Sequence, residues 1–250
     1  MGGPTLVIYT EDSSKDADAT MRALVERLLY RLEPNVQVHR VELRSALGDA
    51  RAAAAAQRWK GQDARGEGLR RALANELARR LVMGDFVVFH YDGDKAWDGQ
   101  PGSPHDGAVA ELYREIHGHV EARGKGAGLL AGFLRLVPFY SVESWLYLNR
   151  KAVVDLVNAG RPLQEGLDWL DAHLDDDLGY DGVKKPKDAC PLGAKCNRTL
   201  AEQQWSAATA AASSPSWRQV EADWTSCAGL MTALRQTCPW LPAPEPDGER

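Results

Sequence analysis

Two predicted strands of this chain each end in carboxylate side chains. An apolar run over residues 86–91 is followed directly by Asp92 and Asp94. A second apolar run, over residues 5–10, is followed by Glu11. If these strands are neighbours in a parallel sheet, their carboxyl ends share the edge where open α/β sheets bind ligands. Carboxylates gathered there repel one another, and a hard divalent cation relieves that repulsion, so the pattern predicts a metal site; the alternative is an ordinary acidic turn.

A fourth candidate ligand is Glu143, which follows a further apolar run over residues 134–140. A divalent ion held by carboxylates can stabilise charge on the non-bridging oxygens of a phosphodiester and provide a nucleophile at neutral pH. For Glu11 and Glu143 the alternative is an acid that favours the positive end of the helix after it.

The densest basic cluster in the second half of the chain consists of Lys184, Lys185, Lys187, Lys195 and Arg198. Such a cluster can contact the phosphate backbone of nucleic acid, and the alternative is a solvated loop. The formal net charge of −5 argues against a surface coated with basic residues, although a local basic groove is compatible with it.

The cysteines and the overall composition indicate a globular protein with reduced thiols. The four cysteines all lie in the last quarter of the chain: Cys190, Cys196, Cys227 and Cys238. Because they lack the closely spaced pairs typical of zinc sites, we do not expect structural zinc. No apolar stretch is long enough to span a bilayer, and the first residues lack the layout of a signal peptide. We therefore expect a cytoplasmic protein without a membrane partner.

Strand and helix patterns alternate along the first 158 residues. Strands are expected over residues 5–10, 36–43, 86–91 and 134–140. Helices are expected from a cap at Ser13 or Ser14 to Leu32, and over residues 49–59, 68–82, 105–122 and 145–156. This alternation predicts an α/β fold with a parallel, doubly wound sheet, Rossmann-like in arrangement, flanked by helices.

Beyond residue 158 the pattern predicts helices and no strand. Helices are expected over residues 162–177, 199–212 and 216–234, with a polar loop over 179–197. We therefore divide the chain into an α/β domain (1–158), a helical C-terminal region (159–238) and a disordered tail rich in Pro and acid (239–250).

The order of these motifs resembles that of the Toprim domain, and most closely that of small stand-alone Toprim-like nucleases of bacterial defence loci. The resemblance covers about the first 200 residues. It rests on Glu11, on Asp92-Gly93-Asp94, on Glu143-Ser144-Trp145-Leu146 and on Lys184-Lys185-Pro186-Lys187. The chain departs from the family pattern at Asp12, where Gly is usual.

The resemblance implies a nuclease that cleaves DNA or RNA phosphodiesters. In it Asp92 and Asp94 would hold Mg²⁺ or Mn²⁺, Glu11 would organise the metal or transfer a proton, and Glu143 would be a further metal ligand. The protein would then be the effector of an antiviral system, controlled by a partner such as an ATPase or by oligomerisation. The alternative from a different class is a non-catalytic α/β module that binds a partner protein or a nucleotide.

Overall fold

The computed structural model describes residues 3–13, 16–94, 103–139, 141–148, 152, 196–203 and 214–239. Its centre is a four-stranded parallel sheet with the strand order β2-β1-β3-β4. The strands are β1 (Thr5–Thr10), β2 (Glu42–Ser45), β3 (Phe86–His90) and β4 (Phe133–Leu136). The prediction of a parallel α/β sheet flanked by helices is confirmed.

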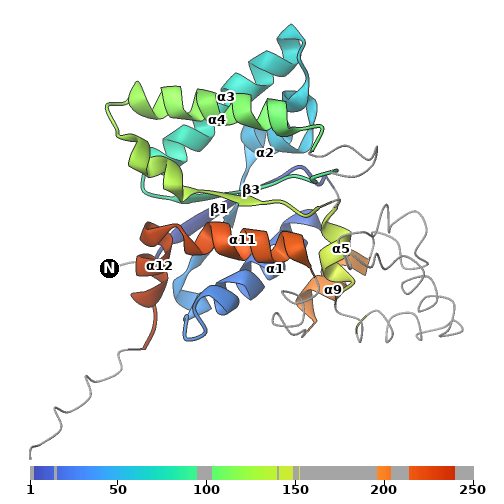
Figure 1. Ribbon diagram of the computed structural model, residues 1–250, viewed down its shortest axis with the longest axis vertical. Coiled ribbons are helices and arrows are strands. Elements are labelled where there is room, and N and C mark those ends of the chain that lie inside the picture. The colour runs from blue at the N-terminus through green and yellow to red at the C-terminus, as the bar shows by residue number, and fades with distance from the viewer. Residues whose placement is uncertain are drawn as a thin grey trace, which may run out of the picture.

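Two layers of helices cover the sheet (Figure 1). One face carries α1 (Ala17–Leu32), α11 (Pro215–Thr225) and α12 (Ala228–Arg235). The other face carries α2 (Gly48–Ala55), α3 (Ala64–Val82) and α4 (Asp106–Glu121). Two short helices, α5 (Val142–Leu146) and α9 (Asn197–Glu202), lie at one end of the sheet (Figure 1). Three 3-10 turns complete the described elements: η1 (Val38–Arg40), η2 (Arg58–Lys60) and η3 (Ala127–Gly132).

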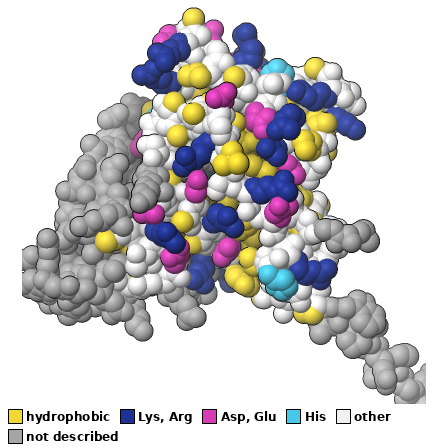
Figure 2. All heavy atoms as spheres, turned by 180° about the vertical axis from the view of Figure 1, so that it is seen from behind, with side chains coloured by type: hydrophobic (Ala, Val, Ile, Leu, Met, Phe, Trp, Pro, Cys, Tyr) yellow, Lys and Arg dark blue, Asp and Glu magenta, His cyan; other side chains and the backbone are white. Residues whose placement is uncertain are grey.

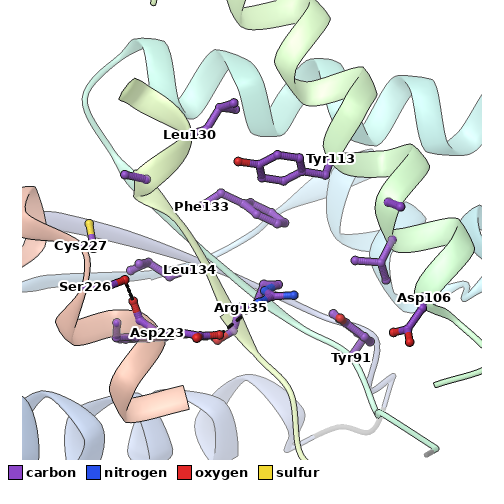
Figure 3. A pocket seen from close by; sticks show the side chains of 14 residues that line it. Tyr91, Asp106, Tyr113, Leu130, Phe133, Leu134, Arg135, Asp223, Ser226 and Cys227 are labelled. Carbon is purple, nitrogen blue, oxygen red and sulfur yellow. Dashed lines mark hydrogen bonds and ion pairs between the residues drawn. The ribbon is translucent and has the colours of Figure 1, made fainter. Parts of the chain in front are cut away.

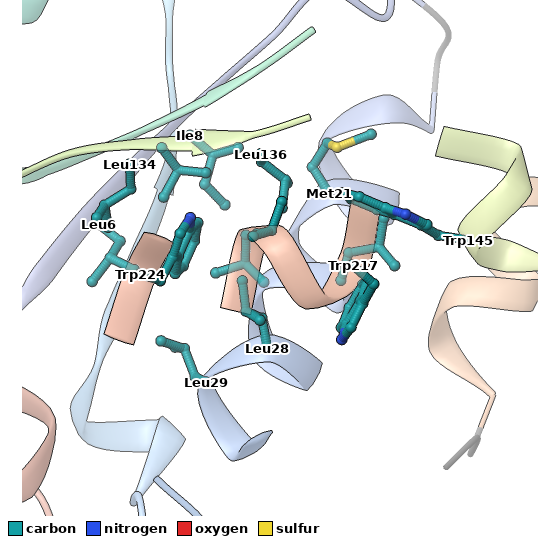
Figure 4. Packing of buried hydrophobic residues seen from close by; sticks show 14 of the residues in the cluster. Leu6, Ile8, Met21, Leu28, Leu29, Leu134, Leu136, Trp145, Trp217 and Trp224 are labelled. Atoms are coloured by element: carbon teal, nitrogen blue, oxygen red, sulfur yellow. The ribbon is translucent and has the colours of Figure 1, made fainter. Parts of the chain in front are cut away.

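The core follows the two-residue period of the strands. Leu6 and Ile8 of β1 pack with α1, α11 and α12, whereas Val7 and Tyr9 pack with α2, α3 and α4. Figure 4 shows the first of these clusters, in which Trp224 of α11 lies beside the strands. The C-terminal helices thus share one core with the sheet. The proposed boundary at residue 158 and the proposed tail stay predictions, because residues 153–195 and 240–250 lie outside the described part.

Trp145, from the Glu-x-Trp-Leu motif, belongs to the same core. It is fully buried, and its ring meets that of Trp217 edge-on at 5.1 Å (Figure 4). Its indole Nε1 donates a hydrogen bond to Ser216 Oγ at 2.8 Å. The motif therefore anchors α5 to α11 through packing.

Several elements differ from the sequence-based expectation. The strand expected over residues 134–140 ends at Leu136, and the helix expected from residue 145 begins at Val142 and ends at Leu146. The first helix begins at Ala17 after Asp16, and not after a cap at Ser13 or Ser14. The predicted strand over residues 36–43 begins only at Glu42, because Val36 and Val41 are buried in the α1 cluster while residues 38–40 form a 3-10 turn. The predicted helix over residues 216–234 is two helices, broken at Ser226 and Cys227. There the Ser226 hydroxyl donates to a backbone carbonyl of the preceding turn, which competes with helix continuation. Among the described helices, none has the length and apolar character needed to cross a membrane.

Candidate functional site

The predicted site lies where the order of the strands reverses. From β1 the chain moves to β2 on one side, and from β2 it returns past β1 to β3 on the other side. The carboxyl ends of β1 and β3 therefore flank the switch point of the sheet, the place where open α/β folds form a ligand crevice. Glu11 follows β1, and Asp92 lies just beyond β3.

Glu11 joins the two strand ends. Its backbone N–H donates to the His90 carbonyl at 3.2 Å, which extends the ladder between β1 and β3. Its Oε1 accepts a hydrogen bond from the Asp92 backbone N–H at 2.6 Å. Its Oε2 lies 2.6 Å from Lys60 Nζ, and the Glu11 side chain is only 3% exposed. The structure thus brings Glu11 and Asp92 together and adds a cation that no motif predicted.

Lys60 is held in place by the residues on both sides of it. Arg70 of α3 is itself buried and donates to the carbonyls of Trp59, at 2.9 Å, and Gly61, at 3.1 Å. The Trp59 ring is fully buried and packs edge-on against Phe89 at 5.4 Å. Since both neighbours of Lys60 are anchored, its ammonium group is preorganised beside its carboxylate partner. The only signal in the sequence was general, namely that a buried carboxylate needs a cation.

Burial dominates the protonation of Glu11. Removal from water raises the pKa of Glu11 above its ordinary value, because it disfavours the charged form. The Lys60 ammonium lowers that pKa and the Asp92 carboxylate raises it again, and the net direction is upward. Glu11 therefore holds a proton more readily than an exposed glutamate does.

His90 is buried beneath this edge rather than open to a ligand. Its Nδ1 shares a 2.9 Å hydrogen bond with Thr10 Oγ1, and its Nε2 lies 3.6 Å from Asp92 Oδ1. Burial lowers the pKa of His90, but the carboxylates of Asp92, Glu11 and Asp12 outweigh this effect, so the pKa is raised overall. The imidazole lies on the core side of these acids.

The loop after β3 is fixed against the segment that follows β4. Asp92 Oδ1 accepts a hydrogen bond from the Val142 backbone N–H at 3.2 Å, and the Gly93 N–H donates to the Pro138 carbonyl at 3.2 Å. A Cβ on Gly93 would lie 2.4 Å from that carbonyl oxygen, so the approach requires glycine. Glu143 follows Val142 on α5, which places its backbone near Asp92, while its side chain lies outside the described part.

Asp94 has an unusual backbone conformation. Its φ of 48° is in the left-handed region, which residues other than glycine rarely adopt. Its Oδ2 lies 2.8 Å from Nε2 of His105, the residue before α4. Strained residues of this kind persist where the surrounding contacts determine them, and they cluster at functional sites.

Of the predicted nucleic-acid contacts, only Arg198 lies in the described part; Lys184, Lys185, Lys187 and Lys195 do not. Arg198 is half exposed and pairs with Glu202 at 2.8 Å and with Asp16 at 3.8 Å. Asp16 precedes α1, so Arg198 lies toward the same edge of the sheet as Glu11. On the face drawn in Figure 2, basic and acidic side chains are interspersed rather than gathered into one basic field.

Carboxylate oxygens, the ligands available at this edge of the sheet, are those that a hard divalent cation prefers, but they do not surround a metal position completely. Within the described ranges, no group of three or more His, Cys, Asp and Glu side chains is arranged to hold a metal ion. Mg²⁺ needs fewer protein side chains than three, because it keeps several waters and binds one or two carboxylates together with substrate phosphates. Asp92 and Asp94 are two carboxylates within that smaller number, and each has one oxygen engaged, by the Val142 N–H and by His105 respectively. Glu11 would join only if Lys60 moved away.

Three of the four cysteines lie in the described part. Cys227, at the junction of α11 and α12, and Cys238, just after α12, are free thiols, and Cys196 lies at the start of α9. Cys190 lies outside the described residues, so the expectation about zinc stays a prediction.

Comparisons with protein-family models, with curated proteins and with solved structures found no match to this chain.

Proposed function

We propose that the protein is a divalent-metal-dependent nuclease that cleaves DNA or RNA phosphodiesters at the carboxyl edge of the sheet. The observation that carries this proposal is the 2.6 Å hydrogen bond from the Asp92 N–H to Glu11 Oε1. It joins the acidic ends of two adjacent strands at the switch point, where ligands of this architecture bind. Acids in this arrangement attract a cation, and a cation there attracts a phosphate.

Each residue has a role that follows from its contacts. Asp92 and Asp94 would hold Mg²⁺ or Mn²⁺, which when bound supplies charge stabilisation to phosphate oxygens and lowers the pKa of water. Glu11 orients the Asp92 loop by accepting its amide hydrogen, and Lys60 neutralises Glu11. The neutralised Glu11 reduces the repulsion that an approaching phosphate meets. His105 orients Asp94 through their 2.8 Å contact.

Control by a partner is part of the proposal. An unregulated nuclease harms its host, so we propose that the protein is an antiviral effector switched by a partner, an ATPase for example, or by oligomerisation. Stable, non-toxic expression of a constitutively active protein without any partner would count against this regulation.

One observation favours the second candidate, a non-catalytic module that binds a partner protein or a nucleotide. Lys60 already neutralises Glu11 at 2.6 Å, so the edge is partly charge-balanced without a metal. In this second candidate, Glu11 and Asp92 hold the segments after β3 and β4 in place through their hydrogen bonds, and no metal ion is needed.

A cleavage assay separates the two candidates. The purified chain is incubated with DNA or RNA and with Mg²⁺ or Mn²⁺, and compared with Asp92→Asn, Asp94→Asn and Glu11→Gln. Asp85→Asn is the matched control, because Asp85 precedes β3 at the opposite edge of the sheet and pairs with Arg80 there. The proposal expects metal-dependent cleavage by wild type and by the control, and its loss in the site variants. Cleavage that is unchanged in Asp92→Asn and Asp94→Asn rejects the site.

A further inference from the structure

A cavity lies along the outer edge of β4, between α4 and α11 (Figure 3). We call it the edge cavity; its volume is about 680 Å³. A second cavity of about 260 Å³ shares four of its lining residues, which are Tyr91, Asp106, Arg135 and Asp223. The second cavity also reaches Pro138, whose carbonyl accepts the Gly93 N–H. The two together lead from the Asp92–Asp94 loop outward along the edge of the sheet.

A strand from a binding partner could not pair easily with the outer edge of β4. The Arg135 carbonyl already accepts a hydrogen bond from Trp224 Nε1 at 2.8 Å, so a strand laid against β4 would have to displace it. The Arg135 guanidinium pairs with Asp223 at 3.1 Å. Helix α11 therefore holds both the backbone and the side chain of Arg135, and the occupant of the cavity must meet side chains rather than backbone.

Aromatic rings form one wall of the edge cavity. Tyr113 of α4 is 43% exposed, and its ring centroid lies 6.1 Å from that of Phe133 at a tilt of 56°. Tyr91 lies at the end of the cavity nearest the Asp92–Asp94 loop (Figure 3). An exposed ring on a cavity wall offers a stacking face to a flat ligand, and bases stack on such faces irrespective of their sequence.

The charges in the cavity favour a base over a phosphate. Two acids, Asp106 and Asp223, line it with one cation, Arg135. Asp106 Oδ2 accepts the Ser103 N–H at 3.1 Å, which fixes that carboxylate at the mouth. The excess of acid repels a phosphate group. Carboxylate acceptors and a guanidinium donor are, however, the groups that read the edges of bases.

We infer that the edge cavity binds an unpaired base of a single-stranded nucleic acid whose backbone passes Asp92 and Asp94 at the carboxyl end of β3. This inference rests on the proposed function and narrows its substrate. A base in a duplex is stacked and paired and would have to be extruded to enter. The volume lies in the range of cavities that take small organic ligands, so one base fits with room for its sugar.

The test is binding without cleavage. A fluorescein-labelled single strand of mixed sequence and the corresponding duplex are titrated with the full chain in EDTA, and anisotropy is measured. The single strand should bind more tightly, and Tyr113→Ala should weaken its binding about 10-fold, while Tyr113→Phe, which keeps the ring, should not. The matched control is Tyr30→Ala, since Tyr30 is 48% exposed but lies on α1, across the sheet. Equal binding of strand and duplex, no binding at all, or an unchanged affinity of Tyr113→Ala overturns the inference.

A second substrate separates this inference from the proposed function. Bis(p-nitrophenyl) phosphate has no base, so its metal-dependent hydrolysis tests the carboxylate site alone. Hydrolysis with no effect of Tyr113→Ala on strand binding rejects the edge cavity and leaves the nuclease. Strand binding that depends on Tyr113, with no hydrolysis of either substrate, rejects the nuclease and leaves the cavity as a binding site.

Discussion

Replacing Lys60 by methionine should destabilise the protein through Glu11. Methionine keeps most of the apolar stem of lysine, but it leaves the Glu11 carboxylate, 3% exposed, without its cation. Removal of one partner from a buried pair costs about 3–5 kcal/mol. Glu11 can escape part of this cost by taking a proton, so we expect about 3 kcal/mol at neutral pH, which lowers Tm by roughly 6–12 °C for a chain of this size.

The pH dependence has a definite sign. Burial already raises the pKa of Glu11, and loss of Lys60 raises it further above the value in the unfolded chain. A group whose pKa is raised on folding adds stability below its unfolded pKa, and this is lost as the pH rises through the folded pKa. Urea unfolding followed by tryptophan fluorescence in EDTA should therefore show a larger deficit for Lys60→Met at about pH 8 than at about pH 5.

A double-mutant cycle checks the cause. Glu11→Gln combined with Lys60→Met should recover most of the stability that Lys60→Met loses. The control pair is Glu42 and Arg44, which lie 2.7 Å apart but are both about half exposed. Arg44→Met should change stability little, because water screens an exposed pair. A coupling between Glu11 and Lys60 no larger than that of the exposed pair would mean that Lys60 does not stabilise the buried Glu11 carboxylate.

Three further predictions concern the loop after β3. Gly93→Ala should lower the free energy of unfolding by about 1–3 kcal/mol, and Tm with it, because the new Cβ would lie 2.4 Å from the Pro138 carbonyl oxygen. The control Gly118→Ala should leave Tm unchanged, because a Cβ there meets no atom within 4 Å. Asp94→Asn should keep the circular dichroism spectrum and Tm of wild type, because Asn tolerates left-handed backbone, and yet lose metal-dependent cleavage. Burial raises the pKa of Tyr91 to about 12, so Tyr91→Phe should remove a tyrosinate absorbance that appears only near that pH. Stability that depends on the neutral Tyr91 should be lost as the pH rises from about 10 through 12.

The sheet and its acidic edge were predictable because their signals are local. Continuous apolar runs mark β1 and β3, as is typical of parallel strands buried on both faces, and the acids follow each strand directly. The alternation with helices then implies parallel pairing, which places Glu11 beside Asp92. The strand β2 was misplaced because Val36 and Val41 face α1, and burial against a helix leaves the same apolar pattern as a strand.

The rest depends on contacts between residues far apart in the sequence. Lys60 meets Glu11 because Arg70 and Trp59 anchor the turn between α2 and α3, and no spacing rule encodes that geometry. The edge cavity exists because Trp224 binds the Arg135 carbonyl, which brings α11 to the outer edge of β4. No sequence motif predicts either contact.

The most direct test of the central claim is the binding of Mn²⁺, measured by the electron paramagnetic resonance signal of the free ion. We expect wild-type protein and Asp85→Asn to remove Mn²⁺ from solution, and we expect Asp92→Asn and Asp94→Asn to bind it much more weakly. Mn²⁺ that stays free in the presence of wild type, or that binds all four proteins equally, would contradict a metal site at the carboxyl ends of β1 and β3.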